Sequence, residues 1–442
     1  MAKAIMSNRQ TMTSAFEAFA GSSREKSRAP ATPEKRFSLP LVSVIITNFN
    51  YGRYLRDAID SVRAQSYPNV ECIIVDDAST DESPSILAAL AAEFPEIKII
   101  RKDSNAGQTA AFCDGFAASD GDYVIFLDAD DVLLPAAVET HAYVHLSSRV
   151  PVGMTTSDMM QSVNGRIVLS CDQCISGYVR SGRGRRENLL RGIDITAPDL
   201  WDFEHLLAKN ISERTHLLEN IGWDEWVYTP TSGNCFRRDA LTLALDTKVL
   251  ARVKLNSDAY LNRFVCLLHG GILIDIALSV YCIHTSNGFI TQAFLFGKLH
   301  YKKEKEIRAN IETWKAAIGV LIDDVTRVYD KLEFHYYYRA IEALSRSTIY
   351  CGQNSDHIYD LSANNAVDYV LDRLHSNETA LRAAVGHEHY RTLLLLIESI
   401  QLAAATKPKS WWRRRVAEFF LTFGRLTRWN WITEQGEQIW RG

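Results

Sequence analysis

Three carboxylates lie within four residues, Asp128-Ala129-Asp130-Asp131, directly after the apolar run 123–127. Alternate residues of an extended segment project to the same side, so Asp128 and Asp130 can face one ion. Mg²⁺ and Mn²⁺ are usually held by one or two protein carboxylates together with phosphate oxygens of a substrate. The cluster therefore indicates a divalent cation site. The competing interpretation is a strand that simply runs into an acidic turn.

The segment before this cluster alternates strand and helix patterns. Near-continuous apolar runs, typical of strands buried on both faces, occur at 41–47, 70–75, 97–100 and 123–127. Helical spacing or capping signals separate them at 54–62, 84–94 and 107–118. This alternation predicts a parallel, doubly wound sheet, in which ligands bind beyond the carboxyl ends of the strands. Three polar motifs fall at such ends and should share one crevice, namely 47–51, 76–77 and 128–131.

The chain from Leu41 to Leu146 resembles the nucleotide-binding half of family 2 glycosyltransferases with the GT-A fold. The resemblance rests on LVSVIITNFNYG, VECIIVDDASTDES and YVIFLDADDVLLP, and shorter stretches match later, at 231–241, 257–261 and 281–284. It implies an α/β fold class, with a Rossmann-like, mostly parallel central sheet flanked by helices and a C-terminal helical region.

The resemblance also implies roles for individual residues. Thr47, Phe49 and Asp77 would hold the base of a nucleotide sugar, with Asp77 accepting from a ring N–H and Phe49 packing on the ring. Asp128 would contact the ribose at or near the metal, and Asp130 would be a metal ligand. The structural alternatives are that Thr47 merely ends a strand and that Asp77 caps the next helix.

Asp258 matches the family position of the general base, which takes the proton of the acceptor hydroxyl. One base and one metal imply a single in-line displacement, and hence inversion at the anomeric carbon. The alternative for Asp258 is a helix N-cap. His284 is the second expected metal ligand, or else a satisfied structural histidine. Many relatives have Arg where this chain has Cys282, which puts a cationic contact to the donor diphosphate in question.

Composition indicates a globular enzyme of 442 residues, with 47% hydrophobic and 23% charged residues. The net charge of −4 and the lack of a dense basic face argue against nucleic acid as a partner. The eight cysteines form no disulfide framework. Neither a secretory signal nor an apolar run of about 20 residues is evident, so we expect a cytoplasmic protein.

We predict three regions from the shifts in composition. Residues 1–40 form a mobile tail, 41–292 form the GT-A domain with an insertion at about 171–228, and 293–442 are helical. Near the C-terminus, the spacing places apolar and aromatic residues on one face of a predicted helix, namely Trp412, Val416, Phe419, Phe420 and Phe423. The arginines lie away from this face, namely Arg413, Arg414, Arg425 and Arg428. This pattern suits peripheral contact with an anionic membrane surface. Docking of the segment onto the enzyme is the alternative.

The sequence thus predicts a metal-dependent, inverting glycosyltransferase of surface polysaccharide or glycoconjugate biosynthesis. Its partners would be a nucleoside-diphosphate sugar and a saccharide or lipid-linked saccharide acceptor, at the inner face of the membrane. Two alternatives are a catalytically inactive scaffold and a nucleotidyltransferase of related fold. Intact Asp130 and Asp258 argue against the first, and 48–52 is not the Gly-rich, basic loop that the second requires.

Overall fold

The computed structural model describes most of the chain after residue 37, namely 38–171, 173–191, 210–219, 221–245, 253, 256–284, 287, 290–295, 298–301, 303–347 and 364–405. Most of the predicted N-terminal tail and all of the aromatic C-terminal segment therefore lie outside the described residues. None of the helices in the described part is both long and apolar enough to cross a membrane.

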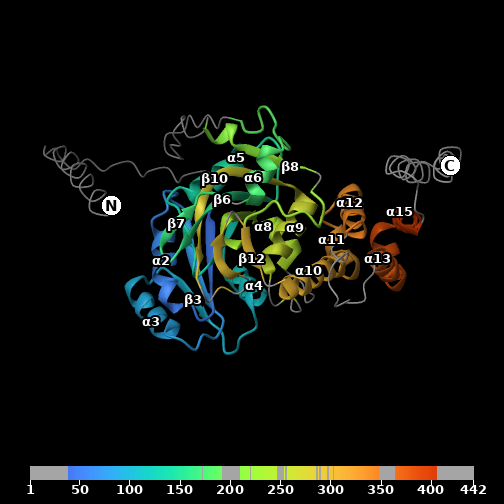
Figure 1. Ribbon diagram of the computed structural model, residues 1–442. Helices are drawn as coiled ribbons and strands as arrows, with labels where there is room; N and C mark the ends of the chain where they lie inside the picture. Colours follow the sequence, from blue (N-terminus) through green and yellow to red (C-terminus); the bar gives the residue numbers. More distant parts are fainter. Residues whose placement is uncertain are drawn as a thin grey trace, which may run out of the picture. The chain divides into compact units, whose positions relative to one another are not determined.

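A ten-stranded sheet forms the centre of the described structure (Figure 1). Its strands are β1 (Val42–Asn48), β2 (Val70–Asp76), β3 (Lys98–Arg101), β4 (Tyr123–Asp128), β5 (Val132–Leu133), β6 (Met154–Val163), β7 (Arg166–Leu169), β8 (Thr215–Leu218), β9 (Asn234–Arg237) and β10 (Gly271–Ile283). They run in the order β3-β2-β1-β4-β9-β6-β10-β5, with β7 beside β6 and β8 beside β10.

The four strands of the first half, β3, β2, β1 and β4, are all parallel. In this register Thr47 lies beside Val75 on one side and beside Asp128 on the other. The carboxyl ends of β1, β2 and β4 therefore meet at one edge, which confirms the predicted α/β arrangement. Beyond β4 the sheet becomes mixed, because β9 is antiparallel to both β4 and β6.

Helices cover both faces of the sheet. One face carries α2 (Gly52–Arg63), α3 (Ser83–Glu93) and α5 (Ala137–Ser147), and the other carries α4 (Gln108–Ala118), α8 (Arg238–Leu245) and α9 (Ser257–His269). Strand β1 contributes side chains to the cores on both faces: Val44 and Ile46 belong to the core on the first face, and Ile45 belongs to the core on the second. Because alternate residues point to opposite faces, a strand covered on both sides must be apolar throughout.

The segment predicted as an insertion contributes α6 (Gln173–Arg180) and β8, and β8 extends the sheet beside the start of β10. The expectation that the chain after 293 is helical throughout is wrong at its beginning. A two-stranded ribbon forms there, with β11 (Ile290–Leu295) antiparallel to β12 (Lys298–Tyr301). The sequence ITQAFL of β11 has β-branched and aromatic residues that favour strands, which accounts for the difference.

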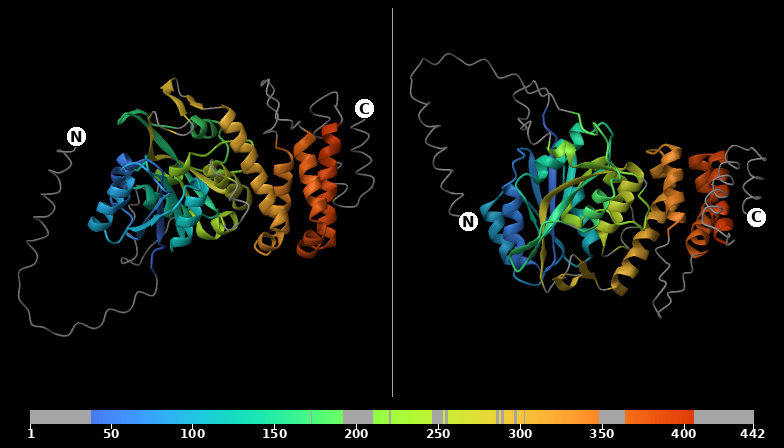
Figure 2. Two further views of the ribbon diagram at one scale, coloured as in Figure 1. Left: turned by 90° about the horizontal axis from the view of Figure 1, so that it is seen from below. Right: turned by 45° about the horizontal axis from the view of Figure 1, so that its top comes forward.

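The helical part begins after this ribbon with α10 (Lys303–Ile318), a π-helical turn η3 (Gly319–Asp323), α11 (Val325–Tyr329), α12 (Phe334–Ser345), α13 (Asn364–Ser376), α14 (Glu378–Val385) and α15 (His387–Ala405). Figure 2 shows these orange and red helices beside one another. Helices α10 and α12 contact α9. The fully buried Trp314 of α10 donates from its indole N–H to the carbonyl of Leu344 at 3.0 Å. The helical region therefore packs on the helix that carries the predicted base.

Candidate active site

The carboxylate cluster begins at the end of β4, at the edge where the parallel strands finish. Gln108, the first residue of α4, donates from Nε2 to Asp128 Oδ1 at 3.0 Å. The backbone N–H of Asp128 donates to Ser232 Oγ at 3.2 Å. Ser232 belongs to a short 3₁₀ turn, η1 (Thr231–Gly233). Asp128 is thus held by α4 on one side and by η1 on the other.

Asp131 is a structural residue of this cluster. It is buried, and it accepts from Ser232 Oγ at 2.6 Å and from the backbone N–H of Cys282 at 2.9 Å. Burial and the charges of Asp130 and Asp128 raise its pKa. Burial and Asp131 raise the pKa of the Cys282 thiol to about 12, so this side chain stays neutral at pH 7. Position 282 offers no cation to a diphosphate, as the sequence suggested.

Asp130 faces the segment that follows β10. His284 Nε2 lies 2.9 Å from Asp130 Oδ2, and Asn287 Nδ2 donates to the same oxygen at 3.3 Å. The His284 ring stacks on Tyr54 of α2 with 4.7 Å between centroids, and the Tyr51 ring meets it edge-on at 5.4 Å. The fold therefore brings together the two predicted metal ligands, which are 154 residues apart in the chain.

The donor set at this point fits a hard cation that substrate phosphates also hold. Asp130 offers carboxylate oxygens and His284 offers a nitrogen, and Mg²⁺ needs only one or two protein carboxylates beside phosphate. Burial, together with the charges of Asp130 and Asp258, raises the pKa of Asp128 to about 7, and a bound cation would favour the ionised form of this carboxyl group. Across the described ranges no three His, Cys, Asp or Glu side chains converge as an ion site. A complete coordination sphere would therefore need ligands from the substrate.

Asp258 approaches this cluster from the first turn of α9. Asn256 is the N-cap residue of that helix, with φ at 65°, so the predicted alternative of Asp258 as the cap does not apply. A buried hydrogen bond of 2.6 Å joins Ser257 Oγ to Thr109 Oγ1 of α4 and fixes the start of α9. Thr231 hydrogen-bonds to the carboxylates of both Asp128 and Asp258. The two carboxylates consequently face the same small space.

The environment of Asp258 suits a proton acceptor. Burial raises its pKa, and the opposing effects come from the backbone N–H of Ala259, at 2.8 Å from Oδ1, and from the charge of Arg263. A carboxylate whose pKa moves towards the operating pH is a better general base than a free one. Arg263 lies five residues further along α9 and is itself buried.

Asp77 holds the loop before α4. Its Oδ1 accepts from the backbone N–H of Ala106 and from Lys102 Nζ, both at 3.0 Å, and its Oδ2 accepts from the N–H of Gly107 at 2.7 Å. A carboxylate offers about four acceptor positions, so about one remains for a nucleotide N–H. The structure therefore gives Asp77 a structural task, while its predicted contact with the base stays a prediction.

Thr47 and Phe49 flank the turn after β1. Thr47 is buried beside Asp128, and its carbonyl accepts from the N–H of Ala129 at 3.1 Å. Phe49 is 44% exposed, an uncommon state among the large apolar side chains that the structure describes. Between them, Asn48 is buried and donates to Asp76 Oδ1 at 2.7 Å, which ties β1 to β2. The exposure of the Phe49 ring leaves it accessible to a planar ligand, and its contact with the nucleotide base stays a prediction.

Sequence reasoning missed several residues that build the site: Gln108, Thr231, Ser232, Asn287 and the Tyr51–Tyr54 pair. Thr231, Ser232 and Tyr51 lay in stretches with a recognisable motif, but no role was predicted for these residues. The others act through contacts between distant elements, so no local pattern could have identified them.

Part of the chain is similar to known proteins. Residues 43–149 match the family model described as Glycosyl transferase family 2. An uncharacterized glycosyltransferase of Nostoc sp. is 35% identical over 202 residues, which cover 45% of this chain and 52% of that protein. A Bacillus subtilis glycosyltransferase named for teichuronic acid biosynthesis is 40% identical over 92 residues, covering 21% and 36%. The chain thus spans about half the length, or less, of these relatives.

Among solved structures, Staphylococcus aureus TarS 1–349 in complex with UDP aligns over 84% of this chain and 93% of that one. The TM-score is 0.38 and the sequence identity is 14%.

Proposed function

We propose that the protein transfers a sugar from a nucleoside-diphosphate sugar to a hydroxyl acceptor, because residues 43–149 match the family 2 glycosyl transferase model. The observation that carries this proposal is the approach of Asp258 to Asp128 and Asp130 at the carboxyl edge of the parallel strands. A nucleotide sugar at that edge would have its leaving group beside Asp130 and its anomeric carbon towards Asp258.

Asp258 would act as the general base of this reaction. Its carboxylate would accept the proton of the acceptor hydroxyl while that oxygen attacks the anomeric carbon. A single base opposite the leaving group implies one displacement and inversion of configuration. Thr231, which hydrogen-bonds to both Asp128 and Asp258, would keep donor and acceptor sides at a fixed separation.

Asp130 and His284 would hold a divalent cation, Mg²⁺ or Mn²⁺. When bound, the cation would stabilise the departing diphosphate as a Lewis acid. The 2.9 Å contact between Asp130 and His284 supports this assignment, because both ligand atoms already point to one place. Thr47, Phe49 and Asp77 would form the nucleotide pocket beside it.

The name of one relative and the C-terminal sequence support a pathway and a location. The named relative in Bacillus subtilis suggests cell-surface polysaccharide biosynthesis, with a saccharide or lipid-linked saccharide as acceptor. The aromatic and basic segment after residue 409 would bring the enzyme to the inner, anionic face of the membrane. Cosedimentation of the protein with anionic and neutral vesicles tests this placement, and a protein that never pellets with anionic vesicles contradicts it.

A panel of nucleotide sugars tests the proposed function directly. We expect one donor to raise the melting temperature and to be slowly hydrolysed in the presence of Mg²⁺ or Mn²⁺, and a chelator to abolish both effects. If no nucleotide sugar stabilises the protein in either metal, the proposal is wrong.

A further inference from the structure

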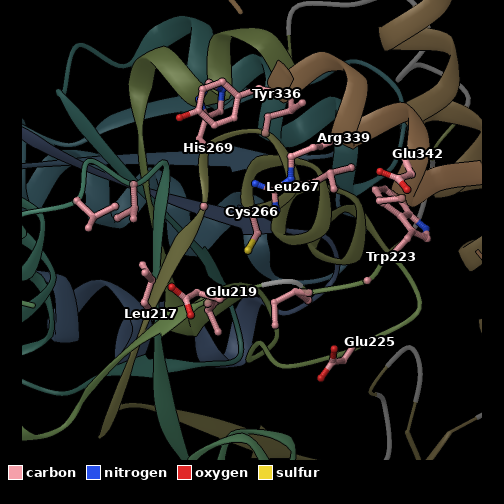
Figure 3. Close-up of a pocket in the computed structure, with 18 of the residues that line it drawn as sticks. Leu217, Glu219, Trp223, Glu225, Cys266, Leu267, His269, Tyr336, Arg339 and Glu342 are labelled. Atoms are coloured by element: carbon pink, nitrogen blue, oxygen red, sulfur yellow. The ribbon is translucent and has the colours of Figure 1, made fainter. Parts of the chain in front are cut away.

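A groove of about 860 Å³ lies between α12 and the edge of the sheet near β8, at the far end of α9 from Asp258. Figure 3 shows Tyr336, Arg339 and Glu342 of α12 on one side of it and Leu217, Glu219 and Glu225 on the other, with Cys266 and Leu267 of α9 between them. Volumes of this size are typical of sites for small molecules or short oligomers.

The walls of the groove contain polar atoms without partners. Trp223 is only 2% exposed, and its indole Nε1 has no hydrogen-bond partner among the described residues. The buried Nε2 atom of His269 likewise lacks one within the part of the chain that is described. Both residues line the groove. Both atoms are shielded from solvent, so the hydrogen-bonding groups that a ligand in the groove would meet are those of the charged and hydroxyl side chains along its walls.

The charged residues of the groove largely neutralise one another. Arg186 is paired with Glu219, and Arg346 Nε lies 3.1 Å from Glu342 Oε1. Asp224 accepts a hydrogen bond from Ser347. The positive and negative side chains of the groove are therefore paired, and the groove has no excess of positive charge. This disfavours a nucleotide or another polyanion as the ligand.

The remaining surface is apolar or aromatic. Tyr336 is 43% exposed at the rim, and Val152, Leu217 and Leu218 contribute apolar walls. Sugars combine apolar C–H faces, which pack on aromatic rings, with many hydroxyls that bond to paired Arg and Glu side chains. An uncharged oligosaccharide therefore matches both parts of the groove.

Arg263 connects the groove to the candidate active site. Its guanidinium carbon lies 6.0 Å from the centroid of the Trp223 ring and 5.2 Å from that of Trp226. Its charge acts on Asp258 in turn. At about 1.5 Å per residue, Asp258 and His269 are separated by roughly 16 Å along α9, which is the smallest distance that an acceptor bound at both places would have to cover.

We propose that this groove binds an uncharged stretch of the saccharide acceptor, several sugar units away from the hydroxyl that reacts. The inference rests on the proposed function for the identity of the ligand as an acceptor. The groove itself would bind saccharide without a donor, so the two proposals can fail separately.

Calorimetric titration of the full chain tests the groove, with neutral oligosaccharides of two to six glucose, N-acetylglucosamine or mannose units as probes and no nucleotide present. We expect one series to bind, with affinity that rises with chain length. Tyr336→Ala should weaken its binding by about tenfold, the effect of losing one favourable ring contact. Ala343→Leu, which places extra apolar atoms in the groove, should weaken it at least as much.

Ile167→Ala is the matched control, because Ile167 is a 53% exposed apolar side chain on β7 that does not line the groove. It should bind the probe as the wild type does, and all three variants should retain the wild-type melting temperature within a few degrees. Two results would contradict the proposal that the groove binds saccharide: no binding of any probe in the panel, or equal binding by wild type, Tyr336→Ala and Ala343→Leu. If nucleotide sugars bind but saccharides do not, only the saccharide-binding proposal is wrong. If saccharides bind and the two groove variants weaken this binding, but no nucleotide sugar binds, only the proposed transferase function is wrong.

Discussion

At the scale of single residues, Asp258 tests the proposed chemistry most directly. Replacement by Asn keeps the shape and the acceptor oxygen for the Ala259 N–H but removes the basic carboxylate. We expect Asp258→Asn to bind donor and metal normally and to lose turnover by ~10²–10⁴-fold, the usual effect of removing a positioned base. Release of nucleoside diphosphate from the donor measures the turnover.

Asp239 provides the matched control for this substitution. It also lies in the first turn of a helix, α8, and accepts from the following N–H at 2.9 Å, but it is exposed and remote from β4's carboxyl end. Asp239→Asn should leave turnover unchanged. Equal losses in both variants would mean that Asp258 stabilises its helix, and that the base lies elsewhere.

Asp130 tests the cation assignment. Asp130→Asn retains a side chain that can bond to His284 and Asn287 but loses the charge that a hard cation requires. We expect the metal-dependent part of nucleoside diphosphate binding, measured by titration with and without Mn²⁺, to disappear while the melting temperature changes little. The exposed Asp103→Asn variant serves as the control. Binding that depends on Mn²⁺ equally in wild type and Asp130→Asn would contradict the assignment.

At the scale of elements, the seating of α4 on β1 determines where Gln108 and Thr109 lie. A Cβ at Gly115 would come within 2.3 Å of Ile45 Cγ2 and 3.1 Å of Val75 Cγ2, so the helix packs on the sheet through the bare glycine. We predict that Gly115→Ala lowers the free energy of unfolding by about 1–3 kcal/mol through overpacking. Urea unfolding measures the change.

The control is Gly177 of α6, where a Cβ would meet no atom within 4 Å. Gly177→Ala should be neutral or should stabilise by up to about 1 kcal/mol, since Ala is the better helix former. A Gly115→Ala variant that behaves like Gly177→Ala would show that α4 does not depend on this close approach.

At the scale of the whole molecule, we expect two histidines of α5, the buried His141 and the partly buried His145, to make stability depend on pH. Burial lowers the pKa of His141 to about 3 and that of His145 to about 4. His141 Nδ1 lies 2.7 Å from Thr155 Oγ1, and His145 Nε2 lies 3.3 Å from the carbonyl of Cys235. Both imidazole side chains are therefore neutral in the folded protein at pH 7.

Because both folded pKa values lie below the unfolded value of about 6.5, protons bind preferentially to the unfolded chain. The two histidines make their full contribution to the free energy of unfolding above about pH 6.5. This free energy should fall as the pH drops from about 6.5 towards 4, by up to about 1.4 kcal/mol per pH unit for each imidazole. His141→Gln should reduce this slope, and the exposed His335→Gln should not. Urea unfolding at pH 7.5, 6.0 and 5.0 measures the slopes, and an unchanged slope in His141→Gln would exclude this linkage.

The amino-acid sequence by itself determined the parallel half of the sheet and the place of Asp128 at its edge. Apolar runs buried on both faces and regular helical spacing are local signals, and parallel strands necessarily end on one side. It could not determine what faces that edge. Three features join segments far apart in the chain: the contact of His284 with Asp130, the hydrogen bond between Ser257 and Thr109 that brings Asp258 close, and the groove beside α12. Such contacts depend on how whole helices pack and how loops close, and only the tertiary structure fixes those arrangements.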